Sequence, residues 1–175
     1  IGSSILWNST KYDTFILEGI DTHVQFKYSP DFKVTMADSA PGIRIFIDRT
    51  FNTYDSSDHL FITSSFRDDI IGLNKRENLS KLNERMDRIL NTWAFLDISE
   101  ISRSRIKVSG YNGLDSTQLY ILPSDNTSII QRIIIFFADG YEWNIWLSYS
   151  ISDMDKSNDW QRVVDIIVKT FIISS

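Results

Sequence analysis

The sequence predicts an α+β domain in which an antiparallel β-sheet is flanked by helices. Apolar and polar residues alternate over several segments before residue 68 and again from about 104 to 150, with short turns between them. This period of two is typical of half-buried strands. Two other segments repeat their apolar residues every three or four positions, which is typical of amphipathic helices. Strands, a helix, strands and a helix in that order favour an antiparallel sheet with helices packed against it.

The first alternating segments predict antiparallel strands joined by short turns. The stretch THVQFKYSP alternates until Pro30-Asp31 interrupts it, and FKVTM continues as a short extended segment. In GIRIFIDRTF, Ile43, Ile45 and Ile47 lie on one face, and HLFITSSF forms a further strand after the polar turn NTYDSSD. The first 68 residues are therefore expected to be mainly strands and turns.

Two helices are predicted, one before and one after the later strands in the sequence. The first runs over about 78–96 with Asn78 or Ser80 as its N-cap, and the second lies in SNDWQRVVDIIVKTFII with Ser157 or Asn158 as its cap. The apolar side of each helix should face the sheet. The solvated side of the first helix is expected to carry Lys81, Glu84, Arg85, Asp87 and Arg88.

The segment FFADGYEWNIWLSYS predicts a hairpin with Asp139-Gly140 as its two-residue turn. A second tight turn is predicted at Asn112-Gly113, because such pairs supply positive φ angles. Strand alternation then defines two faces by the cross-strand pairs Ala138–Tyr141, Phe136–Trp143 and Ile134–Ile145 on one side, and Phe137–Glu142, Ile135–Asn144 and Ile133–Trp146 on the other.

The two faces of this hairpin have different compositions. The first is apolar throughout, so we expect it to form core under the two helices. The second mixes polar and apolar groups, as on a sheet side that is only partly covered. Trp146 is the candidate for contact with a partner, together with Glu142 and Asn144, and the alternative is that its ring is also core.

Composition limits the classes of function. The chain has 175 residues, a net charge of −5 and no cysteine, and its Lys and Arg residues are scattered. This argues against nucleic acid as a partner and excludes disulfides, thiolate catalysis and cysteine-bound metals. We expect a flexible N-terminal segment or tether over 1–11, followed by one monomeric domain over 12–175. A membrane would be contacted only through a removed N-terminal segment.

Few residue patterns indicate catalysis or a cofactor. The two histidines, His23 and His59, lack a nucleophile-elbow motif beside them, and no glycine-rich phosphate loop is present. The strongest candidate for a divalent metal site is YDSSDH, in which Asp55, Asp58 and His59 supply oxygen and nitrogen ligands. The alternative is a polar loop whose Asp and Ser side chains bond the local backbone. We expect no other cofactor.

Four stretches of the sequence resemble the PsbP/Mog1-like family. FKYSPDFKV is similar to its early Y-P-x-x-W/F-x-V motif, and SRIKVSGYNGLDSTQLYI to its V-x-G-x-x-G/A-x-x-x-x-Y strand pair. The hairpin DGYEWNIWLSYS resembles its D-G-x-x-Y hairpin, and Thr170-Phe171-Ile172-Ile173 stands where the family has S-F-x-I, with Thr for Ser. The resemblance covers about residues 12–173, and its motifs are turns, core rings and a helix end.

The resemblance implies an α/β/α sandwich and a non-catalytic role. Members are extracytoplasmic, membrane-peripheral proteins in photosynthetic and other prokaryotic lineages, or a nuclear-transport factor in eukaryotes, and most are binding or assembly factors. The family shares no set of functional residues that could be assigned to positions of this sequence. The expected function is therefore a non-catalytic extracytoplasmic binding or assembly module with an unidentified protein partner. The alternatives are a small-ligand or divalent-metal binding domain and, more remotely, an enzyme.

Overall fold

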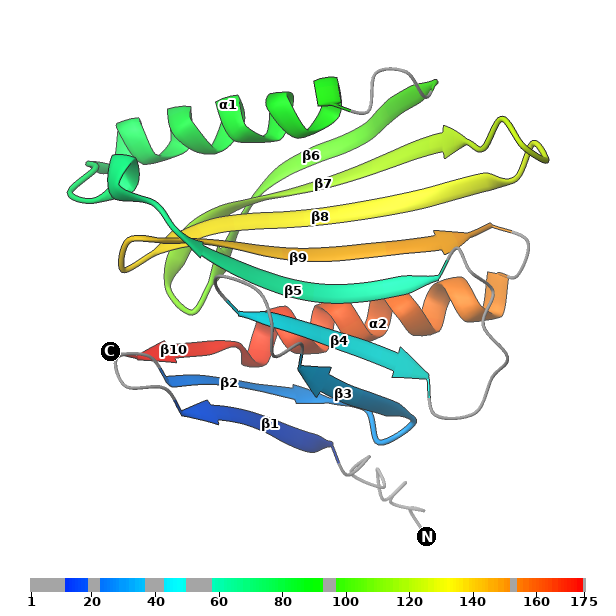
Figure 1. Cartoon of the computed structure of the whole chain (residues 1–175), viewed down its shortest axis with the longest axis horizontal. Coiled ribbons are helices and arrows are strands. Elements are labelled where there is room, and N and C mark those ends of the chain that lie inside the picture. Colours follow the sequence, from blue (N-terminus) through cyan, green and yellow to red (C-terminus); the bar gives the residue numbers. More distant parts are fainter. Residues whose placement is uncertain are drawn as a thin grey trace, which may run out of the picture.

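The computed structural model describes residues 12–18, 23–36, 43–49, 58–92, 97–151 and 154–174, which form two antiparallel sheets and two long helices (Figure 1). The large sheet has the order β3-β4-β5-β9-β8-β7-β6. Its strands are β3 (Phe32–Met36), β4 (Arg44–Arg49), β5 (His59–Phe66), β6 (Ile98–Val108), β7 (Tyr111–Ile121), β8 (Ser128–Ala138) and β9 (Tyr141–Ser150).

The small sheet has the order β1-β2-β10, from β1 (Asp13–Glu18), β2 (His23–Tyr28) and β10 (Ile172–Ser174). The helices are α1 (Lys75–Thr92) and α2 (Met154–Thr170), and a short 3₁₀ helix, η1 (Asp68–Ile70), precedes α1. The predicted α+β class and antiparallel strands are confirmed.

The small sheet was not predicted as a separate unit. Its edge strand β1 lies in a segment that the sequence left outside the strands, and its other edge strand, β10, lies where the second helix was expected to continue. Thr170 ends α2 by donating its hydroxyl to the Ile166 carbonyl at 2.7 Å, while its oxygen accepts the Lys27 amide at 2.8 Å. The chain is thereby joined to β2 and continues beside it as a strand.

The β8–β9 hairpin has the predicted turn and register. Asp139 and Gly140 have φ angles of 50° and 80°, and Phe136 pairs with Trp143. The prediction of a second turn at Asn112-Gly113 is wrong, because the turn is Ser109-Gly110, with φ angles of 51° and 84°. Gly113 lies inside β7, where a Cβ atom would stand 2.7 Å from the Ile135 carbonyl oxygen. This glycine is needed for close strand packing and not for a turn.

Both helices begin earlier than predicted. Asn74 caps α1, since its Oδ1 accepts the amides of Arg76 and Glu77 at 3.0 and 3.1 Å. The Glu77 carboxylate in turn accepts the Asn74 amide at 3.0 Å, which completes a capping box. Helix α2 begins at Met154, so the predicted caps Ser157 and Asn158 lie within it.

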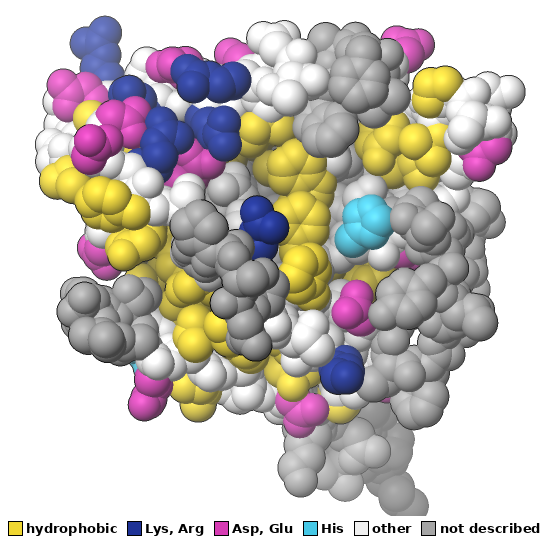
Figure 2. Space-filling view, viewed as in Figure 1, with side chains coloured by type: hydrophobic (Ala, Val, Ile, Leu, Met, Phe, Trp, Pro, Cys, Tyr) yellow, Lys and Arg dark blue, Asp and Glu magenta, His cyan; other side chains and the backbone are white. Residues whose placement is uncertain are grey.

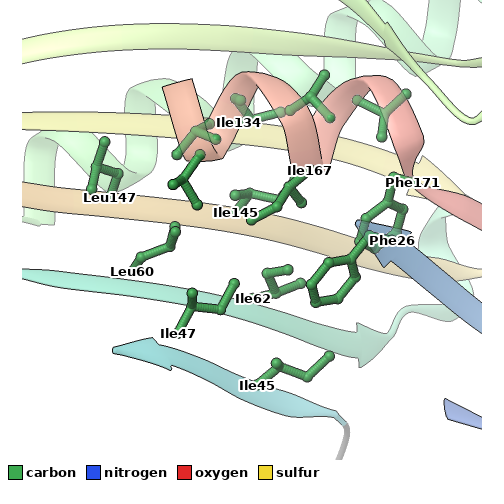
Figure 3. Packing of buried hydrophobic residues seen from close by; sticks show 14 of the residues in the cluster. Phe26, Ile45, Ile47, Leu60, Ile62, Ile134, Ile145, Leu147, Ile167 and Phe171 are labelled. Carbon is green, nitrogen blue, oxygen red and sulfur yellow. The ribbon is translucent and has the colours of Figure 1, made fainter. Parts of the chain in front are cut away.

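The main core lies between the large sheet and a layer made of α2 and the small sheet. Figure 3 shows Ile145 and Leu147 of β9 facing Ile167 of α2, with Phe26 of β2 and Phe171 beside them. Phe26 and Phe171 stack with their ring centroids 5.8 Å apart. Each large side chain buried here contributes about 1.5–3 kcal/mol, so this layer dominates the stability of the domain.

A charged contact also crosses this layer. Arg132 of β8, 13% exposed, is 2.7 Å from Asp115 of β7 and 2.9 Å from Asp165 of α2. Burial lowers the pKa of Arg132, but the hydrogen bonds to these carboxylates outweigh it and raise the pKa overall. Arg132 therefore stays charged and ties α2 to two strands.

Helix α1 packs on the opposite face of the large sheet, over β7 and β8. The expectation that both helices cover the same hairpin face is therefore wrong. The reason is visible in β8, where Ile133 to Phe137 are buried on both faces and so need a cover on each. Since α1 does not extend over β4 and β5, part of this face has no cover from either described helix (Figure 1).

Candidate functional site

The candidate site lies on the α1 face of the large sheet, where the helix ends its coverage. Leu82, Met86 and Ile89 of α1 are buried against an apolar group made of Leu114, Ile133, Ile135 and Phe137. Farther along the same face come β9, β5 and β4, whose outward side chains are set by strand alternation. This face therefore has a half covered by α1 and a half that no described helix covers, which we call the uncovered half.

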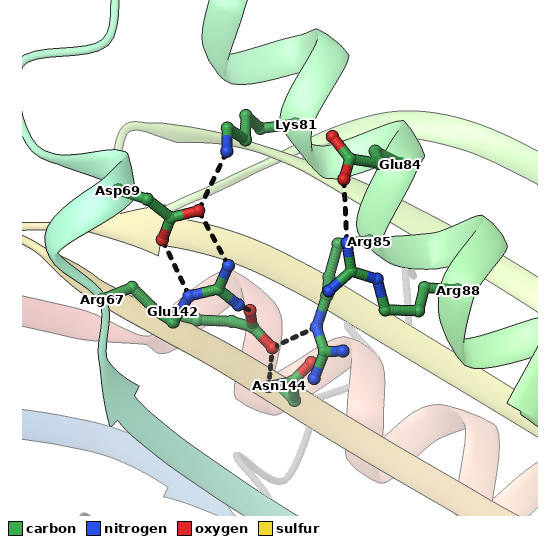
Figure 4. Close-up of polar contacts among 8 residues, drawn as sticks. All are labelled: Arg67, Asp69, Lys81, Glu84, Arg85, Arg88, Glu142 and Asn144. Atoms are coloured by element: carbon green, nitrogen blue, oxygen red, sulfur yellow. Dashed lines mark hydrogen bonds and ion pairs between the residues drawn. The ribbon is translucent and has the colours of Figure 1, made fainter.

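A charged cluster marks the boundary between the two halves (Figure 4). The Glu142 carboxylate on β9 is 1% exposed and accepts hydrogen bonds from Arg67 Nη1 and Arg85 Nε, both at 2.8 Å. Asn144, two residues along the same strand, donates its side-chain amide to Glu142 Oε1 at 3.2 Å. One buried carboxylate thus holds α1, through Arg85, and the segment before η1, through Arg67, against the sheet.

Asp69 extends this charged cluster to the surface. Its carboxylate is 2.9 Å from both Arg67 and Lys81. The hydrogen bonds from Arg67 and then from Lys81 hold the pKa of Asp69 well below its usual range. Asp69 therefore stays ionised and orients Arg67 toward Glu142, so the cluster acts as a fixed support beside the uncovered half.

Three aromatic rings run across the uncovered half, and we call them the aromatic strip: Phe46 of β4, Phe61 of β5 and Trp146 of β9. Trp146 lies at its inner end, where it also packs against the apolar group under α1. Their residues are cross-strand partners in the register. The ring centroids of Phe61 and Trp146 are 5.8 Å apart with planes inclined by 13°, and those of Phe46 and Phe61 are 6.4 Å apart. Trp146 and Phe61 are half-buried, and Phe46 is 37% exposed.

A hollow with a cavity volume of about 320 Å³ opens beside the strip, and we call it the strip pocket. Its apolar and aromatic lining comes from Phe61, Trp146, Ile98, Tyr120 and Leu122. Three polar residues, His59, Gln131 and Ser148, complete it. Figure 2 shows hydrophobic side chains as a band down the middle of this face, below a charged group at the upper left. The volume and the mixed lining are those of a small-ligand site.

The three residues predicted as partner contacts lie together, but in different surroundings. Trp146 is half-buried in the aromatic strip and also lines the strip pocket. Asn144 is half-buried beneath the charged cluster. Glu142 is almost inaccessible, so direct contact of its carboxylate with a partner would need the two arginines to move. Trp146 is therefore the member of this set that is placed to touch a ligand.

The metal candidates are only partly described. Asp55 lies outside the described residues. Asp58 accepts the Ser150 amide at 3.0 Å, which holds β5 beside the end of β9, and His59 lines the strip pocket. Within the described part of the chain, no three His, Asp or Glu side chains gather as metal ligands would. A site of Asp55, Asp58 and His59 thus stays a prediction.

Sequence reasoning missed Gln131, Tyr120 and Phe61 as site residues. Gln131 breaks the apolar run SIIQRIIIFF, so a polar residue on the buried face of that strand was a usable signal. Phe61 could have been found from HLFITSSF, since alternation separates it from Leu60 and Ile62. Nothing in the sequence places Phe61 beside Trp146, because that requires β5 to pair with β9.

The structure has a PsbP/Mog1-like α+β fold, as the resemblance predicted. The solution structure of cyanobacterial PsbP (CyanoP) from Synechocystis sp. PCC 6803 is similar, with a TM-score of 0.62, 12% sequence identity and coverage of 99% of each chain. The crystal structure of LpqN, involved in cell envelope biogenesis of Mycobacterium tuberculosis, has a TM-score of 0.59 and 13% identity, and covers 94% of this chain and 92% of LpqN.

These similarities concern the fold. No family model and no curated protein sequence matches this chain. A search of the described helices finds none with the length and apolar character needed to cross a membrane. The role of the site must therefore be argued from its own side chains.

Proposed function

We propose that this protein is a non-catalytic extracytoplasmic binding or assembly module that contacts its partner through the aromatic strip. The observation that carries the proposal is the strip itself: Phe46, Phe61 and Trp146 lie in one row on the half of the sheet that α1 leaves uncovered. Tryptophan and other large rings are frequent energetic centres of protein interfaces. The free protein is taken to be a monomer.

The rigidity of the surroundings supports this role. Glu142 and its two arginines fix the edge of α1 beside the strip, so the rings are held in place before a partner arrives. A preorganised surface loses little conformational entropy on binding. The neighbouring structures add support for the location, because LpqN is described as involved in cell envelope biogenesis. We do not extend a photosystem role to this chain, since the likeness to CyanoP is one of fold.

The proposal is tested by placing a photo-crosslinking phenylalanine analogue at Phe46 and, as a matched control, at Ile101. Both side chains are exposed, at 37% and 58%, but Ile101 lies on β6, at the far edge of the same sheet. In cells of the source organism we expect one discrete crosslinked partner from position 46 and none from position 101. Phe46→Gln should weaken capture of that partner at least tenfold, while Ile101→Gln should not.

Location is tested in the same cells. Externally added protease should remove the protein from cells whose outer layers have been permeabilised while a cytoplasmic marker survives. Equal crosslinking from both positions, or protection of the protein together with the cytoplasmic marker, contradicts the proposal.

A further inference from the structure

The strip pocket is lined by a largely buried glutamine whose amide bonds no other described residue. Gln131 is 7% exposed and lines the pocket, opposite Ser148 across the β8–β9 pair. No hydrogen bond joins its side chain to another residue in the part of the chain that the structure describes. A polar group that loses water without gaining a hydrogen-bond partner costs about 1–3 kcal/mol, so a ligand that fills the pocket must pair with this amide. An unpaired amide facing a hollow is therefore suited to pair with something that enters it.

The rest of the lining restricts what can enter. Three rings, of Phe61, Trp146 and Tyr120, form much of the wall, and rings pack well against other rings in offset or edge-on arrangements. Among the described residues that line the pocket none is Lys, Arg, Asp or Glu. The Tyr120 hydroxyl lies 3.5 Å from the Ser148 hydroxyl, a long contact that leaves both groups able to bond a ligand.

We propose that the strip pocket binds a neutral, planar ring compound that carries an amide-like edge, with one N–H donor beside one carbonyl acceptor. The Gln131 amide donates to the carbonyl and accepts from the N–H, while the ligand ring packs against Trp146 and Phe61. This inference rests on the proposed function, in which the uncovered half of the α1 face is the binding surface, and it names the class of molecule that this half takes.

Other ligand classes fit the pocket less well. A hydrocarbon chain would leave the Gln131 amide unpaired and more deeply buried. A charged group would lose its hydration without a counter-charge in the described lining. A sugar would bring more hydroxyl groups than Gln131, Ser148, Tyr120 and His59 can pair. The ring compound satisfies the amide and leaves the apolar wall in apolar contact.

The size of the pocket agrees with a small fused ring system. A volume of about 320 Å³ corresponds to about ten molecules of liquid water at ~30 Å³ each. A two-ring lactam fits within that space.

The test uses 2-quinolone, a neutral two-ring lactam, with 1-methyl-2-quinolone and quinaldate as comparison probes. The methyl compound lacks the N–H donor, and quinaldate carries a negative charge. In ¹⁵N-labelled protein, 2-quinolone should shift the side-chain signals of Gln131 and the indole N–H of Trp146. We expect it to bind about tenfold more tightly than the methyl compound, since two hydrogen bonds become one, and more tightly than quinaldate.

Gln131→Leu should remove the preference for 2-quinolone over its methyl derivative. The same change should leave the melting temperature of the free protein nearly unchanged, because the Gln131 amide bonds no other described residue. Gln118→Leu is the matched control: Gln118 is also buried and pairs with Gln131 in the register, but it lies outside the pocket lining and donates to Ser116. It should lower the melting temperature and leave the preference intact.

Equal binding of the two quinolones, tighter binding of quinaldate, or no shift at Gln131 and Trp146 overturns the inference. Its failure is distinguishable from failure of the proposed function. If crosslinking at Phe46 still captures one partner, the aromatic strip remains a binding surface and only the ligand class is wrong.

Discussion

Glu142 carries the charge on which the position of α1 depends. A carboxylate that is 1% exposed has lost its hydration and is stable only through Arg67 and Arg85. Both arginines are about 30% exposed, so part of their charge is still solvated, and removal of Glu142 should cost less than for a fully buried pair.

Glu142→Gln should lower the free energy of unfolding by about 2 kcal/mol, because a neutral amide cannot balance the charge of Arg67 and Arg85. The amide NH₂ group would also face an arginine N–H, and both are hydrogen-bond donors. Urea denaturation followed by circular dichroism measures the loss. Glu84→Gln is the matched control: Glu84 pairs with Arg88 at 2.9 Å, but both side chains are about 60% exposed. Glu84→Gln should lower the free energy of unfolding by less than about 0.5 kcal/mol. Equal losses in the two variants would show that Glu142 is no more than a surface ion pair.

The sequence predicted the strand position of Glu142 but not its partners. Hairpin alternation placed Glu142, Asn144 and Trp146 on one face, and the register confirms this. The same reading assigned Arg85 to a solvated helix face, whereas its guanidinium reaches over the sheet to Glu142. Periodicity gives the direction of a side chain around its own helix. It does not reveal that Arg85 lies beside Glu142 of β9, which is 57 positions later in the sequence.

The N-terminus of α1 shows how a local signal can be outweighed by a stronger one nearby. Apolar spacing favoured a start at Asn78 or Ser80, but Asn74 and Glu77 form a capping box one turn earlier. The Asn-x-x-Glu spacing is itself readable, so this boundary was within reach of the sequence. Caps bind their own backbone and need no tertiary information.

Asn74→Ala should lower the free energy of unfolding by about 1 kcal/mol, because two helix amides lose their acceptor. Ser80→Ala, at the exposed position that apolar spacing suggested as a cap, should change it by less than about 0.3 kcal/mol. Chemical denaturation of the two variants beside the wild type gives both values. A larger loss from Ser80→Ala would mean that the helix begins where the periodicity placed it.

The two hairpins of the large sheet differ in how well they could be predicted. Asp139-Gly140 lies between two long alternating runs, so turn chemistry and periodicity agree. Between β6 and β7, Gly110 and Gly113 are three residues apart and either could form the turn. Gly113 is required inside β7 because the carbonyl oxygen of Ile135 on β8 would be only 2.7 Å from a Cβ atom at position 113. That contact involves a third strand and is not visible in the local sequence.

The molecule has two hydrophobic clusters of unequal size on the two faces of one sheet. The cluster under α2 and the small sheet gathers rings and branched side chains from both sheets and α2. To the smaller cluster, α1 adds the buried Leu82, Met86 and Ile89 and the partly buried Leu79. The buried run of β8 shows that both faces are covered there, but each helix pattern fits either face equally well. Which helix takes which face follows from chain connectivity, and so does the uncovered half that carries the aromatic strip.

Because α1 is held by the smaller cluster, it should open before the rest of the domain. Native-state hydrogen exchange is expected to give lower protection for the amides of α1 than for those of β8, β9 and α2, since local opening follows the apolar area that must be exposed. Glu142→Gln should lower protection in α1 further while the amides of α2 keep their values, because the carboxylate holds only the α1 side. Glu84→Gln should leave both helices unchanged. Equal exchange in α1 and α2, or equal loss in both helices with Glu142→Gln, would mean that the two layers open as one cooperative unit.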